Sequence, residues 1–291
     1  MPLSNLIRSI ASKTPGARKL VSFLVKFLPS SFKANFRGMD LYINPRDVRN
    51  FIDVFFPLKH PNHWYNALSL VISEGDRIID VGGNIGLTAI IAAKSTKETG
   101  EVIVFEPEPD CYRLLKKNIK LHGMTNIRAY DIALSDRDGF LNFFIDKDYS
   151  ILNSLSEKNI LNKSEKIVVQ TVKYDSFMTE PMKVHLLKMN IQGGERLVIE
   201  GARKMIKQYL PMVISEFWPE GLRNMDSDPE EFIKYFVDLG YEIYSIDLNG
   251  TVSSISESTI QQKLNRREDD SRTLFLLFQH KKGSKYIKEF L

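Results

Sequence analysis

The sequence predicts an α/β fold of the Rossmann-like type, with a mostly parallel, doubly wound sheet and an antiparallel final strand. From Asp76 onward, short apolar and β-branched runs alternate with helical patterns, which is typical of a parallel sheet covered on both faces. A glycine-rich turn follows the first of these runs and opens a helix, and acidic residues stand at the ends of successive strands. We place this domain at residues 71–291, after an N-terminal basic helical or extended region at residues 1–70.

The first part of the domain reads as strands separated by helices. A helix is expected at residues 86–94 and a second one after Asp110, which we predict to be its N-cap. Gly123 is placed as the C-terminal stop of the second helix. The strands are expected at residues 77–81, 101–106 and 127–132.

The second part begins with a change to period-two alternation, which predicts a hairpin with a long polar connecting loop at residues 146–166. Asp228 followed by Pro229 is a strong helix start. A polar loop at residues 253–272 is a candidate to fold over a site. The other elements are expected as strands at residues 184–189, 211–217, 241–247 and 273–279, and a helix at 195–208.

Composition excludes several protein classes. The chain has 291 residues, one cysteine and a formal net charge of +4, so we expect no internal disulfide and a reducing, cytoplasmic setting. No apolar run reaches the ~20 residues of a membrane-spanning helix. The pair His60 and His63 lacks further ligands nearby, and we predict no metal site. The modest charge, with no basic cluster near the predicted strands, argues against nucleic acid as a partner.

The N-terminal region has a charge pattern of its own. No acidic residue precedes Asp40. An apolar run at residues 20–28 lies among the basic residues, so this stretch either packs on the core as an amphipathic helix, which we favour, or lies on an anionic membrane surface through residues 1–39. The basic residues are Arg8, Lys13, Arg18, Lys19, Lys26, Lys33 and Arg37.

The sharpest motif is Asp80-Val81-Gly82-Gly83-Asn84-Ile85-Gly86, between a strand and a helix. Its glycines let the backbone turn tightly and let a ligand approach the main chain. Asp80 would repel a pyrophosphate but attract the ammonium and sulfonium groups of S-adenosylmethionine. Glu106 ends the second strand where an acid can accept both hydroxyls of a ribose. Asp131, followed by Ile132 and Ala133, is expected beside the adenine.

Together with five further stretches, this motif resembles the FkbM-type methyltransferases over roughly residues 75–240. The resemblance implies a class I methyltransferase fold, S-adenosylmethionine as cofactor and hydroxyls of sugars or polyketides as typical acceptors. It also implies that Asp80, Gly82, Asn84, Gly86, Glu106 and Asp131 are cofactor positions. The further stretches are FEPEPDCYRLLKKNIKLHG, IALSD followed by NSL, TVKYDSF and LLKMNIQGGERLVIEGA.

The chain departs from the family where a carboxylate pair is usual, because Asn190 and Gln192 are amides. An amide is no base, but it can donate and accept the hydrogen bonds that align an acceptor. We predict that Asn190 orients the acceptor and that Glu216 or Asp175 supplies a carboxylate. Glu195 is a further polar candidate, or else a residue favouring a helix start, and Phe217 and Trp218 are either walls for a sugar-like acceptor or core.

Two functions follow from these expectations. The leading one is O-methylation of a hydroxyl on a glycan, glycolipid or other small molecule, with S-adenosylmethionine as methyl donor. The alternative is a non-catalytic protein that keeps the cofactor crevice and has lost the chemistry through Asn190 and Gln192.

Overall fold

The computed structural model describes residues 29–36, 38–47, 63–146, 149–160, 162–247, 249–265 and 274–287. The expected N-terminal helix and the possible membrane-facing run therefore lie outside the described residues, as does His60. No helix in the described part of the chain is long and apolar enough to span a bilayer.

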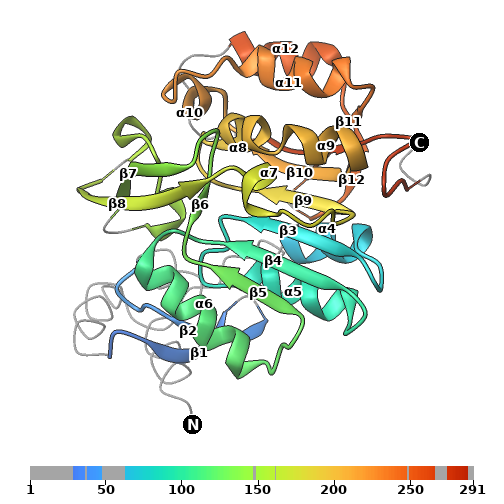
Figure 1. Ribbon diagram of the computed structural model, residues 1–291. Coiled ribbons are helices and arrows are strands. Elements are labelled where there is room, and N and C mark those ends of the chain that lie inside the picture. Colours follow the sequence, from blue (N-terminus) through green and yellow to red (C-terminus); the bar gives the residue numbers. More distant parts are fainter. Residues whose placement is uncertain are drawn as a thin grey trace, which may run out of the picture.

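The centre of the molecule is an eight-stranded sheet in the order β12-β11-β13-β10-β9-β3-β4-β5 (Figure 1). Strands β5, β4, β3, β9 and β10 pair in parallel, and β13 is antiparallel to both β10 and β11. Edge strand β12 is also antiparallel to its neighbour β11. This strand order, with the final strand β13 reversed between β10 and β11, confirms the predicted class I methyltransferase fold. The strands are β3 (Arg77–Val81), β4 (Glu101–Phe105), β5 (Ile127–Tyr130), β9 (Leu186–Met189), β10 (Met212–Phe217), β11 (Glu242–Ile246), β12 (Val252–Ser254) and β13 (Leu274–Gln279).

The order reverses between β3 and β9. From β3 the chain builds outward through β4 and β5, and it then returns to place β9 on the other side of β3. In open α/β sheets a ligand crevice forms outside the carboxyl ends of the strands at such a reversal. A ligand site is therefore expected at the carboxyl ends of β3 and β9.

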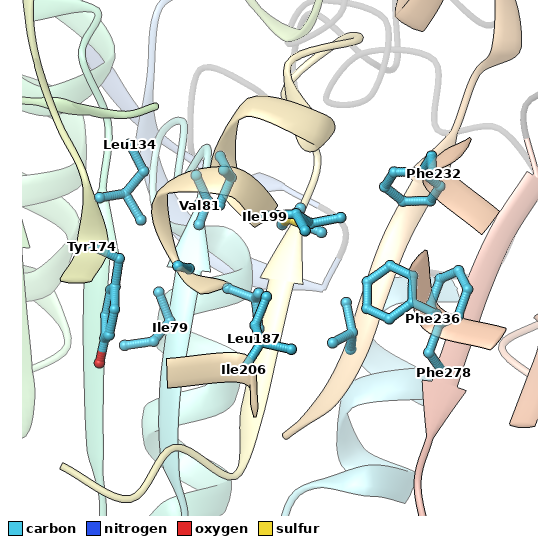
Figure 2. Close-up of a cluster of buried hydrophobic side chains, with 14 of the residues drawn as sticks. Ile79, Val81, Leu134, Tyr174, Leu187, Ile199, Ile206, Phe232, Phe236 and Phe278 are labelled. Carbon is cyan, nitrogen blue, oxygen red and sulfur yellow. The ribbon is translucent and has the colours of Figure 1, made fainter. Parts of the chain in front are cut away.

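Two hydrophobic clusters cover the two faces of the sheet. Neighbouring residues of one strand point into different clusters: Ile78 belongs to one and Ile79 to the other, as the alternation of side chains along a strand requires. In the second cluster Phe232, Phe236 and Phe278 pack together (Figure 2). The helices that cover the sheet are α4 (His63–Val71), α5 (Leu87–Thr96), α6 (Pro109–Leu121), α7 (Tyr174–Phe177), α8 (Glu195–Gly201), α9 (Arg203–Tyr209), α10 (Pro219–Arg223), α11 (Pro229–Asp238) and α12 (Glu257–Asn265).

Three local predictions about helices need correction. Helix α6 is capped by Glu108 and not by Asp110, because the Glu108 carboxylate accepts the backbone N–H groups of Asp110 and Cys111. The single helix expected at residues 195–208 is two helices that meet at Ala202. The described part of the polar loop at 253–272 contains α12, whose Ile260 is buried in the second cluster, so this helix packs on the core.

The predicted hairpin is present. Strands β7 (Gly139–Asp146) and β8 (Ser164–Val172) pair antiparallel and form a three-stranded sheet with β6 (Ala133–Leu134). Their connection contains two 3₁₀ turns, η1 (Ser150–Leu152) and η2 (Glu157–Asn159). We call residues 149–160 the cavity loop, because several of them line the cavity described below.

The described part of residues 1–70 packs on the sheet domain. Strands β1 (Phe32–Phe36) and β2 (Met39–Ile43) form a hairpin beside α6 (Figure 1). Leu41 and Ile43 are fully buried in the first cluster. The Asn118 side chain on α6 accepts the Tyr42 N–H at 2.6 Å and donates to the Tyr42 carbonyl at 2.9 Å. The hairpin is therefore part of the same core.

Candidate functional site

A cavity of about 690 Å³, partly open to solvent, lies at the carboxyl ends of β3, β4 and β9. This volume includes space at the mouth of the cavity that is open to solvent. Glu106 is the one ionisable side chain among the described residues that line it. The lining residues are Val81, Gly82, Asn84, Phe105, Glu106, Pro107, Ala133, Leu134, Phe143, Ser150, Ile151, Asn153, Leu155, Asn190 and Ile191.

The glycine turn shapes this cavity in two ways. Gly82 has a φ of 75°, and a Cβ there would stand 2.5 Å from the Asn190 carbonyl oxygen, so only glycine lets the β3 and β9 loops approach this closely. Gly86 has a φ of 95°, and a Cβ there would stand 2.7 Å from Leu115 Cδ1. Gly82 lines the cavity, whereas Gly86 allows α5 to pack closely against α6 and does not line it.

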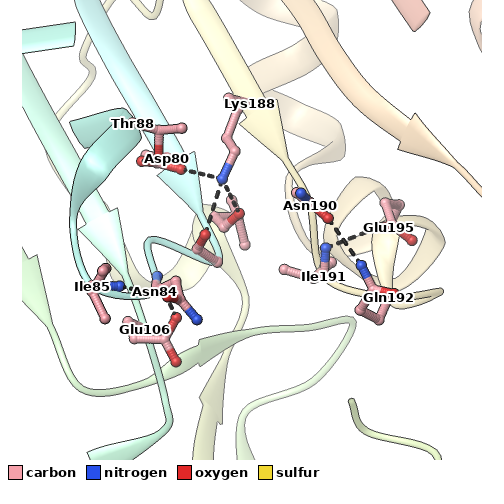
Figure 3. Close-up of polar contacts among 12 residues, drawn as sticks. Asp80, Asn84, Ile85, Thr88, Glu106, Lys188, Asn190, Ile191, Gln192 and Glu195 are labelled. Atoms are coloured by element: carbon pink, nitrogen blue, oxygen red, sulfur yellow. Dashed lines mark hydrogen bonds and ion pairs between the residues drawn. The ribbon is translucent and has the colours of Figure 1, made fainter. Parts of the chain in front are cut away.

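Glu106 is the buried acid of the cavity, with 5% of its surface exposed. Its Oε2 accepts the Asn84 N–H at 2.7 Å (Figure 3). Its Oε1 accepts the Glu108 N–H at 2.9 Å. Burial raises the pKa of Glu106 to about 7, against the lowering effect of these two hydrogen bonds. Each carboxylate oxygen keeps a second lone pair, so Glu106 can still accept two hydroxyl donors.

Asp80 is not the unpaired acid that the sequence predicted beside the cofactor, because its carboxylate is paired within the protein. It is 2% exposed, accepts the Thr88 hydroxyl at 2.7 Å, and its Oδ1 lies 2.7 Å from Lys188 Nζ. Lys188 also donates to the Gly82 carbonyl at 2.9 Å (Figure 3). The pair neutralises the charge of Asp80 and ties the glycine turn to β9. Asp80 itself does not line the cavity.

Lys188 is a site residue that the sequence reasoning missed. It is 3% exposed and belongs to β9, whose residues are all buried. The signal was present in the sequence, because a lysine within the apolar run VHLLKM needs a buried partner of opposite charge. The partner, Asp80, is more than a hundred residues earlier in the chain.

The acceptor-side amides form a short network. Gln192 donates through Nε2 to Asn190 Oδ1 at 3.1 Å and to Glu216 Oε2 at 2.6 Å. Asn190 lines the cavity, whereas Gln192 and Glu216 are buried behind it. Glu216 is linked to the cavity wall through Gln192 and Asn190 and does not itself line the cavity, so the prediction that it contributes a carboxylate directly to the acceptor site needs correction.

Asp175, the other predicted catalytic carboxylate, caps a helix. Its two oxygens accept the backbone N–H groups of Lys204 at 2.7 Å and Met205 at 3.0 Å, at the start of α9. It does not line the cavity. The segment TVKYDSF around Asp175 does not indicate this capping role, because helix α9 begins about thirty residues later in the chain.

The remaining predicted positions divide between the cavity and the core. Three residues at the end of the third predicted strand were expected beside the adenine. Ala133 lines the cavity, Ile132 is buried but does not line it, and Asp131 is exposed and does not line it. Glu195 is 3% exposed and its Oε1 accepts the Ile191 N–H at 3.0 Å, so it braces the loop after β9, and burial raises its pKa. Phe217 is fully buried in the second cluster and is core.

A comparison with protein-family models identifies the group to which this arrangement belongs. The model of the methyltransferase FkbM domain matches residues 80–243, which is more than half of the chain and contains the glycine turn, Glu106 and the amide network. The chain belongs to the FkbM methyltransferase family. The cofactor of this FkbM chain is accordingly S-adenosylmethionine.

Curated relatives of this FkbM chain are distant and longer than the match. Methyltransferase 1 of Beauveria bassiana is 21% identical over 43% of this chain and 57% of its own length. An uncharacterized protein of Methanocaldococcus jannaschii is 30% identical over 35% of this chain and 43% of its own length. The 2-O-methyltransferase NoeI of Sinorhizobium fredii is 25% identical over 48% of this chain and 62% of its own length. The chain thus spans about half the length of these relatives.

Among solved structures, a methyltransferase FkbM from Methylobacillus flagellatus KT is similar to this chain with a TM-score of 0.48 at 14% identity, over 90% of this chain and 59% of that one. The strand order of the central sheet is itself that of a class I methyltransferase.

The cavity fits the cofactor of the family. Glu106 could accept ribose hydroxyls, and apolar residues such as Phe105 and Leu134 could form walls for a ring system. The described residues contain no group of three or more His, Cys, Asp or Glu side chains that could hold a metal ion. Of the predicted cofactor positions, Gly82, Asn84, Glu106 and Ala133 line the cavity and could hold the cofactor there. Lys188 and Asp80 support the glycine turn from behind it.

Proposed function

We propose that this FkbM chain transfers a methyl group to a hydroxyl oxygen of a glycan, glycolipid or other small molecule. The observation that carries the proposal is the fixed amide of Asn190 in the cavity wall. S-adenosylmethionine, when bound, supplies an electrophilic methyl group on a sulfonium. The chain's own residues then have to hold an acceptor oxygen in line with it.

The hydrogen-bond network fixes which end of the Asn190 amide is available. Both N–H groups of the Gln192 amide are used, one by Glu216 and one by Asn190 Oδ1. Because its oxygen is occupied by Gln192, Asn190 presents its Nδ2 donor as the free end of the amide. A donor can bind one lone pair of an acceptor hydroxyl and leave the other lone pair free to form the new bond.

The charge of the wall is consistent with this role. Glu106 is the residue that we propose for the ribose, and no other ionisable side chain lines the described cavity. We therefore infer that Asn190 aligns the acceptor and that the hydroxyl proton passes to water. Alignment alone can account for several kcal/mol of a reaction barrier. The relative NoeI carries 2-O-methyltransferase in its name, which supports oxygen as the acceptor atom.

The test is a kinetic comparison of two asparagines. Asn190→Ala removes the donor in the cavity, and the control Asn142→Ala removes an exposed asparagine on β7. With labelled cofactor and a pool of hydroxylated acceptors, we expect Asn190→Ala to lower kcat/KM by about tenfold or more, the effect of one hydrogen bond to the reacting group, and Asn142→Ala to leave it unchanged. Equal activity of both variants would refute the role of Asn190.

The lack of a carboxylate on the described acceptor side of the cavity favours a second candidate, a cofactor-binding protein without turnover. The two candidates differ in one variant. If wild type is silent with every acceptor while Asn190→Asp with Gln192→Glu is active, the second candidate replaces the first.

A further inference from the structure

A buried carboxylate outside the family domain contacts a residue that lines the cavity. Asp47 follows strand β2, ahead of the residues matched by the family model, and is 5% exposed. Its Oδ2 accepts the backbone N–H of Ser150 at 2.8 Å. Burying a carboxylate is costly unless it is hydrogen-bonded, so this hydrogen bond helps to stabilise Asp47 in its buried position against the cavity loop.

The contact continues into the cofactor site. Ser150 accepts a hydrogen bond on Oγ from Asn84 Nδ2 at 3.2 Å, and the Asn84 N–H donates to Glu106 at 2.7 Å. Ser150, Asn84 and Glu106 all line the cavity. A series of hydrogen-bonded residues therefore runs from Asp47, after the N-terminal hairpin, through Ser150 of the cavity loop to the glycine turn and Glu106.

The cavity loop depends on partners from elsewhere in the chain. Turn η1 has no side-chain hydrogen bond from its own N-cap residue, Tyr149, and Asp47 satisfies the first N–H of the turn instead. At the other end of the loop, the Ser154 hydroxyl donates to the Gln192 carbonyl at 3.0 Å. The loop is thus held on the cofactor side by Asp47 and on the acceptor side by Gln192.

We propose that Asp47 is a positioning residue for cofactor binding, which holds the cavity loop against the glycine turn so that Asn84 and Glu106 stay aligned. The inference rests on the proposed function, because it assumes that the cavity binds S-adenosylmethionine. It makes the turn that follows the N-terminal hairpin a support of the cofactor site, although this turn precedes the residues matched by the family model.

The experiment measures S-adenosylmethionine affinity by calorimetry on the full chain, well below its melting temperature. We expect Asp47→Ala to raise Kd about tenfold and Asp47→Asn, which keeps an oxygen acceptor without the charge, to raise it about threefold. The matched control is Asp40→Ala, on the same hairpin, whose side chain is 54% exposed and pairs with Lys33. This control is expected to leave Kd unchanged.

Two further readouts separate positioning from a general loss of stability. A purely structural role would lower the melting temperature and leave the Kd of the folded protein unchanged, whereas positioning changes Kd and also speeds hydrogen exchange of the Ser150 amide. Because Asp47 and Ser150 act through one loop, Asp47→Ala combined with Ser150→Ala should raise Kd by less than the product of the two single effects.

The outcomes are distinct. If Asp47→Ala does not fold, the Asp47→Asn variant decides: an unchanged Kd in whichever variant folds, or an equal rise in Asp40→Ala, overturns the inference. Wild-type protein that fails to bind S-adenosylmethionine at all refutes the cofactor assignment instead. Wild-type binding with a raised Kd in the Asp47 variants supports both.

Discussion

The buried acid Glu106 should make cofactor binding depend on pH near neutrality. Its pKa in the free protein is raised by burial from 4.5 to about 7. Ribose hydroxyls donate to a carboxylate and favour its charged form, so binding requires Glu106 to be ionised. At pH 5.5 only about 3% of the free protein carries the ionised group, and the dissociation constant is expected to be roughly thirtyfold larger than above pH 7.5.

The same shift has a consequence for stability, and its sign can be worked out. The folded protein binds more protons than the unfolded chain between pH 4.5 and about 7, so stability from this group is present below pH 4.5 and is lost as pH rises through 7. A shift of this size corresponds to about 3 kcal/mol at high pH. The cofactor should offset part of this cost, so it should raise the melting temperature more at pH 8 than at pH 6.

Calorimetry between pH 5.5 and 7.5 checks the prediction, with Glu106→Gln as the comparison. The variant cannot titrate, so its weaker binding should vary much less with pH. Buffers of different ionisation enthalpy should also reveal proton release on binding near pH 6. A dissociation constant of wild type that is flat across this range, or proton uptake on binding, would show that Glu106 is not the residue that accepts the ribose.

Three further variants test the supporting contacts. Lys188→Met leaves the Asp80 carboxylate buried without its cation and should lower the free energy of unfolding by about 3–5 kcal/mol in urea titrations, with recovery when Asp80→Asn is added; no loss would disprove the pair. Gln192→Glu replaces the 2.6 Å hydrogen bond to Glu216 by two adjacent carboxylates, so the pKa of one of the two should rise. The stability of the variant should then fall as pH rises through that pKa. A difference in melting temperature between variant and wild type that does not change with pH would count against the network. Glu108→Ala removes the cap of α6 and should lower the free energy of unfolding by about 1 kcal/mol, measured by thermal melting. The control Asp110→Ala, in the first turn of the same helix, should lower it much less.

Strand positions were predictable from sequence because burial on both faces requires continuous β-branched runs. RIIDV and EVIVF are buried at nearly every position, and the glycine turn between β3 and α5 is required by backbone conformation at Gly82 and Gly86. These signals are local, so they survive without knowledge of the rest of the chain. The helix stop at Gly123 was found for the same reason, since its φ of 62° suits glycine.

The roles of charged residues were harder to predict because their partners are far away in the sequence. Asp80 looked like a free acid at a strand end, and only the pairing of β3 with β9 brings Lys188 to it. Asp175 has the same difficulty, since its capping role depends on the packing of α9. The sequence shows where these acidic residues stand along the chain, whereas the tertiary fold determines which groups they contact.

The measurement that tests the central claim most directly follows the methyl group itself. S-adenosylmethionine with an isotopically labelled methyl is incubated with the chain and hydroxylated acceptors, and mass spectrometry with product fragmentation locates the label. The account predicts label on a hydroxyl oxygen of an acceptor and its loss in the Asn190→Ala variant. Tight cofactor binding with no label transferred to any acceptor, or label found on nitrogen or carbon, would contradict the account.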